Sequence, residues 1–320
     1  MKVLFVSSGN SSKGISSIVK AQGASLESLG IQVDYYTIIG HGILGYLKNV
    51  PRLRQILKQG KYDLVHAHYS FCGITSSVAA KRAMVVSLMG SDVKSSGIWR
   101  CVLRIFVKRI WSATIVKSED MKKCLGLDCI HVIPNGVDLN EFRPLDKYQC
   151  RAKLGWNVDK DIVLFAADPS RFEKNYSLAE EAVKHIKRDD VLLKVVNNVQ
   201  HSDMPLYLNA ADILVLTSSW EGSPNVVKEA MSCNTKIVAV KVGDIPWLLD
   251  GLENCYVTSH DPIEIAGKIH QALQFIGTTN GRERLVFLGL DSESIAIKII
   301  ELYQNVLDNR KLWEPLVSKI

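Results

Sequence analysis

Residues 213–231 read ILVLTSSWEGSPNVVKEAM, an apolar run followed by a polar loop and an amphipathic segment. The run predicts a buried strand over Ile213–Thr217, and Pro224 suits the first turn of a following helix. Gly222 permits a close backbone approach, so free N–H groups at that helix start can bind an anion. These residues predict one strand–loop–helix unit of an α/β fold with a phosphate-binding end.

Short apolar runs of the same kind recur along the chain, separated by segments of helix length. The predicted strands of the first half are Val3–Ser7, Gln32–Ile38, Leu64–His68, Met84–Leu88, Ala113–Lys117 and Cys129–Ile133. Those of the second half are Ile162–Ala166, Leu192–Val196, Ile213–Thr217, Lys236–Val240 and Asn254–Val257. Strands that alternate with helices favour parallel βαβ winding over a sandwich. We therefore predict two Rossmann-like, doubly wound α/β domains over residues 1–145 and 146–302, divided by a cluster of turn residues at 135–144. An amphipathic helix is predicted after Asp291.

Two carboxylates flank the predicted helix start. Glu221 lies in the loop before it, and Glu229 lies about one and a half turns into it. Such a pair suits the hydroxyl groups of a sugar or ribose on either side of a diphosphate. The alternative is a well-capped surface helix with two incidental acids.

A second polar loop, residues 167–175, follows the strand that opens the second half. Loops at the carboxyl end of the first strand of an α/β domain face the crevice in which such sheets bind ligands. Arg171 can form a fork to a phosphate, and Lys174 can make a point-charge contact. The alternative is a solvated turn, because basic loop residues often have no other role.

Polar residues also end two predicted strands of the first half, where His66 and His68 close one and Asp92 follows the next. Both runs should deliver side chains to the same carboxyl edge of the sheet. The two histidines point the same way only if the strand persists, and one of them is expected to be structural. No third ligand is near in sequence, so we expect no metal site. Asp92 has capping of the following segment as its alternative role.

The loop at residues 7–14 is rich in small polar residues and follows the first predicted strand. Its backbone N–H groups can approach a phosphate or a hydroxyl-rich ligand, which makes Asn10 and Gly14 candidates for ligand contacts. The loop lacks the GxGxxG spacing of a dinucleotide site, which argues against an oxidoreductase.

The composition is that of a globular chain, with 320 residues and 47% hydrophobic content. Its 39 Lys and Arg and 33 Asp and Glu give a net charge of +6, divided as +10 for residues 1–145 and −4 for residues 146–320. Such a division suggests two domains with different partners.

The seven cysteines form no CxxC pair, which favours a reduced compartment without zinc or a disulfide scaffold. No apolar stretch approaches the roughly 20 residues of a spanning helix, so we expect a cytoplasmic protein.

Together these motifs resemble glycosyltransferase family 4, retaining enzymes of the two-domain GT-B fold that transfer a sugar from a nucleotide-sugar donor. The resemblance covers nearly the whole chain and is most specific at the Glu-x7-Glu element of Glu221 and Glu229. It extends to residues 63–69, 90–92 and 132–138 and to the loop of Arg171 and Lys174. Residues 204–212 and 242–246 are similar to the bacterial cell-envelope polysaccharide branch of the family.

The resemblance implies two domains that face each other across a cleft, the acceptor domain first and the donor domain second, with residues 303–320 returning to the first domain. It implies that Arg171 and Lys174 bind the diphosphate, Glu221 the transferred sugar and Glu229 the ribose, while Asp92 orients a sugar. The leaving diphosphate meets fixed positive charge, so neither a metal nor another cofactor is implied. The implied donor contacts are Gly14, Ser223, Pro224, Asn225, Val226 and Glu229, and the implied acceptor or sugar contacts are Asn10, His66 and His68.

Two residues depart from the family pattern. Met89 stands where many relatives have a histidine, and a thioether cannot take over the role of an imidazole. Arg171 also lies closer to Lys174 than in the commoner family spacing. Two rival hypotheses stand beside sugar transfer. One is a nucleotide-sugar epimerase or hydrolase on the same fold, and the other, to which Met89 gives weight, is a non-catalytic partner that kept the fold and lost activity.

The basic excess lies in two segments of the first half. Residues 44–61 and 99–111 mix lysines and arginines with aliphatic and aromatic residues. Such segments suit an anionic membrane surface, and the alternative is that their apolar residues are core and their cations a solvated face. Since relatives of this kind act on lipid-linked acceptors, we expect a peripheral protein on the inner face of the membrane. No nucleic-acid reading element is found.

Overall fold

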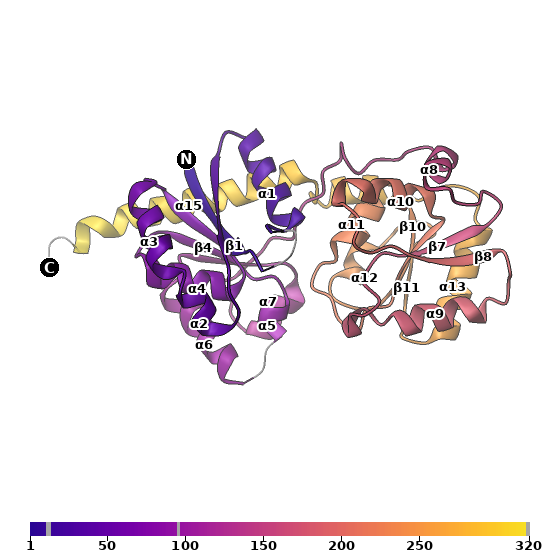
Figure 1. Ribbon diagram of the computed structural model, residues 1–320, viewed down its shortest axis with the longest axis horizontal. Coiled ribbons are helices and arrows are strands. Elements are labelled where there is room, and N and C mark those ends of the chain that lie inside the picture. The colour runs from indigo at the N-terminus through magenta and orange to yellow at the C-terminus, as the bar shows by residue number, and fades with distance from the viewer. Residues whose placement is uncertain (11–13, 95–96, 318–320) are drawn as a thin grey trace. The chain divides into compact units, whose positions relative to one another are not determined.

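The computed structural model describes residues 1–10, 14–94 and 97–317, which form two compact units. Residues 1–136 and the final helix make up the first unit, and Val137–Asp291 make up the second. Each unit is a parallel sheet with helices on both faces (Figure 1).

The first unit has six strands in the order β2-β1-β3-β4-β5-β6. They are β1 (Lys2–Ser8), β2 (Gln32–Ile38), β3 (Leu64–His68), β4 (Met84–Ser87), β5 (Ala113–Val116) and β6 (His131–Val132). The helices are α1 (Ser17–Ser28), α2 (Gly42–Leu47), α3 (Val50–Gln59), α4 (Ser70–Ala79), α5 (Ser91–Lys94), α6 (Ile98–Arg109), α7 (Glu119–Leu125) and α15 (Ser292–Val317). Helix α1 packs beside α15 on one face, while α2 and α3 pack against α4 on the other (Figure 1).

The second unit has five strands in the order β11-β10-β9-β7-β8. They are β7 (Asp161–Phe165), β8 (Val191–Val195), β9 (Ile213–Leu216), β10 (Lys236–Val240) and β11 (Tyr256–Thr258). Its helices are α8 (Lys147–Leu154), α9 (Tyr176–His185), α10 (Met204–Ala210), α11 (Asn225–Ser232), α12 (Ile245–Leu248), α13 (Pro262–Gln274) and α14 (Gly281–Phe287), with short 3-10 turns η1 (Phe172–Lys174) and η2 (His201–Asp203).

All eleven predicted strands are confirmed, together with the predicted helix after Asp291. Their apolar runs are continuous because central parallel strands are covered on both faces, as in β3, where every residue is buried. Three strands, β2, β3 and β10, have their predicted bounds, and the other eight differ from them. The largest differences are in β6, which has two residues, and in β11, which begins at Tyr256 instead of Asn254.

The units divide earlier than the domain bounds predicted from the turn cluster. Residues 137–145 already belong to the second unit, because Arg282 donates hydrogen bonds to the carbonyls of Leu139 and Phe142, both 2.8 Å long, and Leu145 N donates to Asn209 Oδ1 at 2.7 Å. Likewise, α15 is continuous from Ser292, so the segment that joins the first unit begins well before the predicted residue 303.

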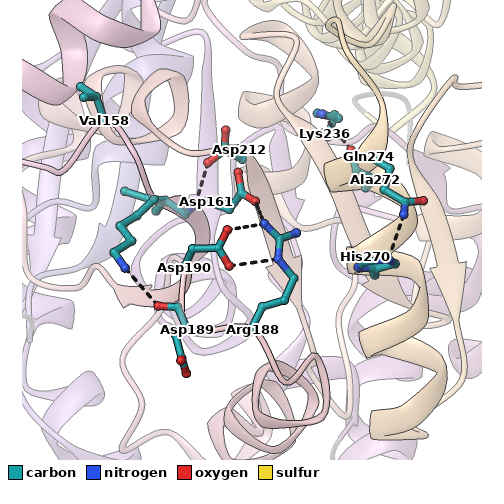
Figure 2. A network of polar contacts seen from close by, with 12 residues as sticks. Val158, Asp161, Arg188, Asp189, Asp190, Asp212, Lys236, His270, Ala272 and Gln274 are labelled. Carbon is teal, nitrogen blue, oxygen red and sulfur yellow. Dashed lines mark hydrogen bonds and ion pairs between the residues drawn. The ribbon is translucent and has the colours of Figure 1, made fainter.

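Charged side chains form ion pairs and hydrogen bonds at the amino ends of the strands of the second sheet. Arg188 forms a fork to Asp190 and reaches Asp161 at 2.7 Å (Figure 2). Nearby, the buried Arg151 donates to Asp212 Oδ2 at 2.5 Å and to several backbone carbonyls. Arg188 thus joins the segment before β8 to β7, and Arg151 joins α8 to the residues before β7 and β9, so we assign this edge of the sheet a structural role.

Candidate functional site

The candidate site lies at the carboxyl ends of β7 and β9. The strand order of the second unit reverses between these two strands, and α/β sheets bind ligands at such a switch point. The loops that follow the strands are tied together, since Thr217 Oγ1 donates to the carbonyls of Lys174 and Asn175 at 3.2 and 3.0 Å. A further bond joins Ser219 N to the carbonyl of Glu173 at 2.9 Å. The topology thus brings two predicted loops to one place.

A lysine and a glutamate meet at this switch point. Lys174 Nζ lies 2.6 Å from Glu221 Oε1, and Ser218 Oγ donates to the same oxygen at 2.8 Å. The two charged side chains are 17% and 13% exposed. A small cavity of about 20 Å³ adjoins Lys174 and is also lined by Val226. The site therefore presents a fixed cation and a fixed carboxylate side by side at the ligand-binding edge.

The backbone around Glu221 is held by the loop after β10. Gly243 has φ +54°, and a Cβ there would lie 2.5 Å from the carbonyl oxygen of Gly222. Asp244 N donates to that same carbonyl at 3.3 Å. Burial lowers the pKa of Lys228 to about 8, opposed by the charges of Asp244 and Glu229. The close approach of Gly243 and the hydrogen bond from Asp244 thus restrict the conformation of the Glu221–Gly222 turn.

Helix α11 starts directly after this turn. Pro224 occupies its N-cap position, one residue before the predicted first turn, and Asn225 is the first helical residue. The N–H groups of a first helical turn have no partner within the helix, so this end favours an anion. Ser223 Oγ is shielded from solvent and has no hydrogen-bond partner among the described residues. The helix start therefore combines backbone donors with a buried hydroxyl group that has no protein partner among the described residues.

The second predicted carboxylate has a partner that the sequence did not indicate. Glu229 lies on α11, and His201 Nε2 is 2.9 Å from its Oε1. The bond to Glu229 raises the pKa of His201, with burial acting in the opposite direction. No sequence signal identifies His201, because the two residues are 28 positions apart and meet only through the fold.

Arg171 lies apart from the Lys174–Glu221 pair. Its guanidinium donates to Glu173 Oε1, two residues away, and its side chain is 56% exposed. Exposed ion pairs of this kind are weak, so the guanidinium can exchange this partner for another anion. The structure therefore brings together Lys174, Glu221 and the start of α11, and leaves Arg171 outside.

The two histidines of β3 are core residues in this structure. Their ring centroids are 4.3 Å apart in a stacked arrangement. Both side chains therefore lie on the same side of β3, as expected if the strand continues through both residues. His66 shares hydrogen bonds of 2.5 Å with Tyr303 Oη and 2.8 Å with Ser87 Oγ. Both nitrogens of His66 are thus occupied by protein partners, which differs from its predicted ligand contact. His68 is also buried, and neither of its nitrogens has a hydrogen-bond partner among the described residues.

Asp92 caps backbone groups at the carboxyl edge of the first sheet. Its carboxylate accepts from the N–H groups of Ser70, Met89 and Gly90 at 3.1, 3.0 and 2.9 Å. Burial raises the pKa of Asp92, while these backbone bonds lower it. The carboxylate therefore holds the turn before Asp92 and the start of α4. These bonds differ both from the predicted role in orienting a sugar and from the alternative of capping the following segment.

The loop after β1 contains the two remaining candidates. Asn10 pairs with the backbone of Gly40 through both ends of its amide, at 2.7 and 2.8 Å, so it holds a neighbouring loop instead of facing a ligand. Gly14 has φ +69°, and a Cβ there would meet nothing within 4 Å, which leaves space for a ligand. Residues 11–13 of this predicted loop lie outside the described residues.

A larger cavity, of about 420 Å³, lies at the opposite edge of the second sheet. Its charged lining groups already have partners: Lys147 pairs with Asp212 at 2.8 Å, and Lys236 donates to two carbonyls at the end of α13. The edge faces away from the carboxyl ends of the strands, where α/β sheets bind ligands. We therefore place the functional site at the smaller cavity.

Neither a metal-binding cluster of side chains nor a membrane-spanning helix is found in the described part of the chain. Over residues 1–10, 14–94 and 97–317, no cluster of three His, Cys, Asp or Glu side chains is arranged to hold a metal ion. Within the same ranges, no helix has the length and apolar character needed to cross a membrane.

Two family models match the chain, one in each half. The model described as Glycosyltransferase Family 4 matches residues 20–141, and that described as Glycosyl transferases group 1 matches residues 161–274. The chain therefore carries a family 4 glycosyltransferase domain in its first half and a group 1 glycosyltransferase domain in its second. The second match contains Lys174, Glu221 and Glu229, so the candidate site lies within the region that the group 1 model covers.

Curated relatives of this chain include two bacterial enzymes. It is 28% identical over 230 residues to the UDP-Gal:alpha-D-GlcNAc-diphosphoundecaprenol alpha-1,3-galactosyltransferase of Escherichia coli, covering 58% of this chain and 59% of the relative. It is 25% identical over 287 residues to the D-inositol 3-phosphate glycosyltransferase of Mycobacterium tuberculosis, covering 75% of this chain and 60% of the relative. The chain therefore spans about 60% of the length of these relatives.

Solved structures share the fold of this chain. Sucrose-phosphate synthase from Thermosynechococcus elongatus has a TM-score of 0.76 at 19% identity, covering 96% of this chain and 99% of that one. HepE from Anabaena, solved in complex with UDP and glucose, has a TM-score of 0.75 at 19% identity, covering 95% and 100%. The two parallel-sheet α/β units thus have the GT-B fold, as predicted.

Proposed function

We propose that the protein is a retaining, metal-independent hexosyltransferase that moves a sugar from a nucleotide-sugar donor to a lipid-linked glycan in cell-envelope polysaccharide synthesis. The observation that carries this proposal is the Lys174–Glu221 pair beside the start of α11, at the switch point of the second sheet. Cation, carboxylate and backbone donors are the groups that a sugar diphosphate needs. The two family-model matches support the same chemistry.

The proposed reaction breaks the bond between the anomeric carbon and the diphosphate oxygen. The oxygen of an acceptor hydroxyl forms the new bond on the same face of the sugar, and its proton goes to the departing diphosphate. Lys174 and the N–H groups of α11 stabilise the negative charge that develops on the leaving group. Glu221 accepts hydrogen bonds from sugar hydroxyls, and Glu229 accepts them from the ribose. Arg171 joins the diphosphate by exchanging Glu173 for phosphate.

We also propose that the acceptor is linked to a lipid. The E. coli relative is described as acting on GlcNAc-diphosphoundecaprenol, and its match covers 58% of this chain. We propose an acceptor of the same chemical class, a glycan on a polyprenyl diphosphate, and a peripheral location on the inner membrane face.

Donor binding is tested by thermal unfolding in the presence of UDP, GDP, ADP and their hexose conjugates. A ligand that binds only the folded state raises its stability, by about 2.7 kcal/mol at 100 times its dissociation constant. We expect one nucleotide series to raise the melting temperature of the wild type, and a smaller rise for Lys174→Ala. Absence of a shift with every nucleotide would contradict the donor assignment.

The same donor then distinguishes transfer from the rival reactions. Nucleotide release from the donor should be slow until GlcNAc-diphosphoundecaprenol, or a related lipid-linked glycan, is added. Fast release without acceptor would indicate a hydrolase, and interconversion of the donor sugar would indicate an epimerase. Donor binding without any turnover would support a non-catalytic partner.

The surface of the first unit supports contact with an anionic membrane. Residues 39–61 and 97–111 contain no Asp or Glu. Tyr46 on α2 and Trp99 on α6 both pack against Phe71, with ring centroids 5.4 and 4.6 Å away, so the two helices share one surface. That surface exposes aliphatic side chains beside its cations, including Leu44 at 76% and Ile98 at 84%.

The alternative interpretation, in which the apolar residues of these helices belong to the core, is also partly correct. Leu53, Leu57, Leu103 and Val107 are buried in the core of the first unit. The amphipathic pattern therefore serves two purposes: one face of each helix packs on the unit, and exposed residues such as Leu44 and Ile98 remain available to lipid.

Liposome co-sedimentation at two salt concentrations tests the membrane contact. We expect binding to vesicles with anionic lipid, weaker binding at high salt, and loss of about 30-fold in affinity in the double variant Lys108→Ala, Arg109→Ala, since each cation near the surface contributes about 1 kcal/mol. Replacing the exposed Lys153 and Lys184 of the second unit is the charge-matched control and should have little effect. Equal binding to neutral vesicles would contradict the electrostatic form of the proposal.

A further inference from the structure

A histidine from a loop of the second unit contacts the carboxylate assigned to the ribose. His201 opens η2, after the loop that follows β8, and Glu229 lies on α11. Nε2 of the imidazole is 2.9 Å from Oε1 of the carboxylate, and the side chains are 29% and 9% exposed. Two residues from separate elements thus form a partly buried hydrogen-bonded pair within the candidate site.

The imidazole also packs against the segment that opens the second unit. Its ring centroid is 5.2 Å from that of Phe142, which is itself buried. The carbonyl of Phe142 accepts hydrogen bonds from Arg282, at 2.8 Å, and from the hydroxyl of Ser232. The position of the His201 ring is therefore set by a fixed neighbour on one side and by Glu229 on the other.

The bond uses only one oxygen of the carboxylate. No hydrogen bond to Oε2 of Glu229 is found among the described residues. A hydrogen bond to one oxygen restricts the rotation of the carboxylate, so its second oxygen favours a narrower range of directions for hydroxyl donors. Without the imidazole, Glu229 would lose this orientation and would have to order itself when the ligand binds.

We propose that His201 is a positioning residue for donor binding, which fixes Glu229 so that its free oxygen accepts a hydrogen bond from the ribose of the nucleotide. This inference rests on the proposed function, because it takes the ribose as the ligand of Glu229. The charged groups that face the imidazole are Glu229 on α11 and Glu141 beside Phe142, and both raise the pKa of His201. Asp203 is a further acid on η2 itself.

The test measures the affinity of UDP, GDP and ADP by calorimetry and uses whichever binds most tightly as the probe. We expect His201→Ala to weaken binding about tenfold, with kcat at saturating donor changed less than about threefold. His201→Gln should restore most of the affinity, because its amide N–H can still donate to the carboxylate. His185→Ala, on an exposed part of α9, is the control and should bind as the wild type does.

Two further measurements separate positioning from a merely structural role. The deoxyribose form of the probe should bind more weakly than the ribose form to the wild type, and this difference should shrink in His201→Ala. Affinity of the wild type should fall as the pH rises through the raised pKa of His201, above 6.5, because the imidazolium loses its charge and its obligatory Nε2 donor. His201→Gln should show no such fall.

The variant Glu229→Gln separates failure of this inference from failure of the proposed function. If Glu229→Gln binds the probe as tightly as the wild type, the ribose assignment of Glu229 is refuted. If Glu229→Gln weakens binding while His201→Ala does not, only the positioning role is overturned. Weakening of equal size in His201→Ala and His201→Gln, with the ribose preference intact, would also overturn it.

Discussion

Replacing Lys174 by alanine is expected to lower the rate of sugar transfer by about 100-fold or more. The lysine places a positive charge at the switch point where the diphosphate would depart, and loss of one such preorganised group costs about 2.7–4 kcal/mol of transition-state stabilisation. The variant also leaves the carboxylate of Glu221 without its 2.6 Å partner, so that it repels the diphosphate. The measurement is kcat and kcat/KM for transfer, with the melting temperature showing that the fold is retained.

Variants around this pair sharpen the test. Glu221→Ala should cause a loss of similar size, and the double variant should lose much less than the sum because the two side chains act together. Arg171→Ala should have a smaller effect, since Arg171 pairs with Glu173 outside the cluster. Lys153→Ala, on the exposed side of α8, is the charge control and should act like the wild type. Turnover within about twofold of the wild type in both Lys174→Ala and Glu221→Ala would defeat the site assignment.

The first unit is expected to lose stability steeply in acid. His66 and His68 are fully buried, and burial is the main cause that lowers the pKa of each, for His68 to about 3, with the charge of Lys117 adding to the effect. Between about pH 3 and 6.5 the unfolded chain therefore binds protons that the folded chain does not. Stability is complete above pH 6.5 and falls as the pH decreases, by about 1.4 kcal/mol per pH unit for each histidine and about 2.7 kcal/mol for the two.

Hydrogen exchange in β3, corrected for the intrinsic effect of pH, measures this slope in the first unit. His68→Leu should reduce it by about 1.4 kcal/mol per pH unit, and at neutral pH it should cost little, because neither ring nitrogen of His68 has a hydrogen-bond partner among the described residues. His270→Ala, at an exposed position of α13, should leave the slope unchanged. An unaltered slope in His68→Leu would show that His68 does not resist protonation in the folded state.

The strands were predictable because their signal is local. A parallel strand covered on both faces must be apolar throughout, and eleven such runs, spaced by helices, leave few arrangements other than two parallel sheets. Lys174 and Glu221 were predictable for a related reason: each follows a central strand, and the carboxyl ends of neighbouring strands share one edge. The domain bounds were less predictable from the sequence, because a turn-rich segment such as residues 135–144 marks a connection without showing which unit it packs against.

The same edge rule failed to separate ligand contacts from core. His66, Asp92 and Asn10 all lie at carboxyl edges, yet their polar atoms are occupied by Tyr303, by backbone N–H groups and by Gly40. Tyr303 is 237 positions from His66, and only the return of α15 to the first unit brings them together. His201 illustrates the converse, because a residue with no motif of its own acquires a place in the site through its contact with Glu229.

Sequence by itself determined the two parallel sheets, the loops that face their ligand-binding edges and the family of the chain, because these depend on periodicity and short motifs. Tertiary structure alone decided which polar side chains meet. It paired Lys174 with Glu221 and His201 with Glu229, and it left Arg171 with Glu173. The physical reason is that hydrogen bonds and ion pairs act over about 3 Å. Partners at that distance are selected by strand order and helix packing, which bring distant parts of the chain together.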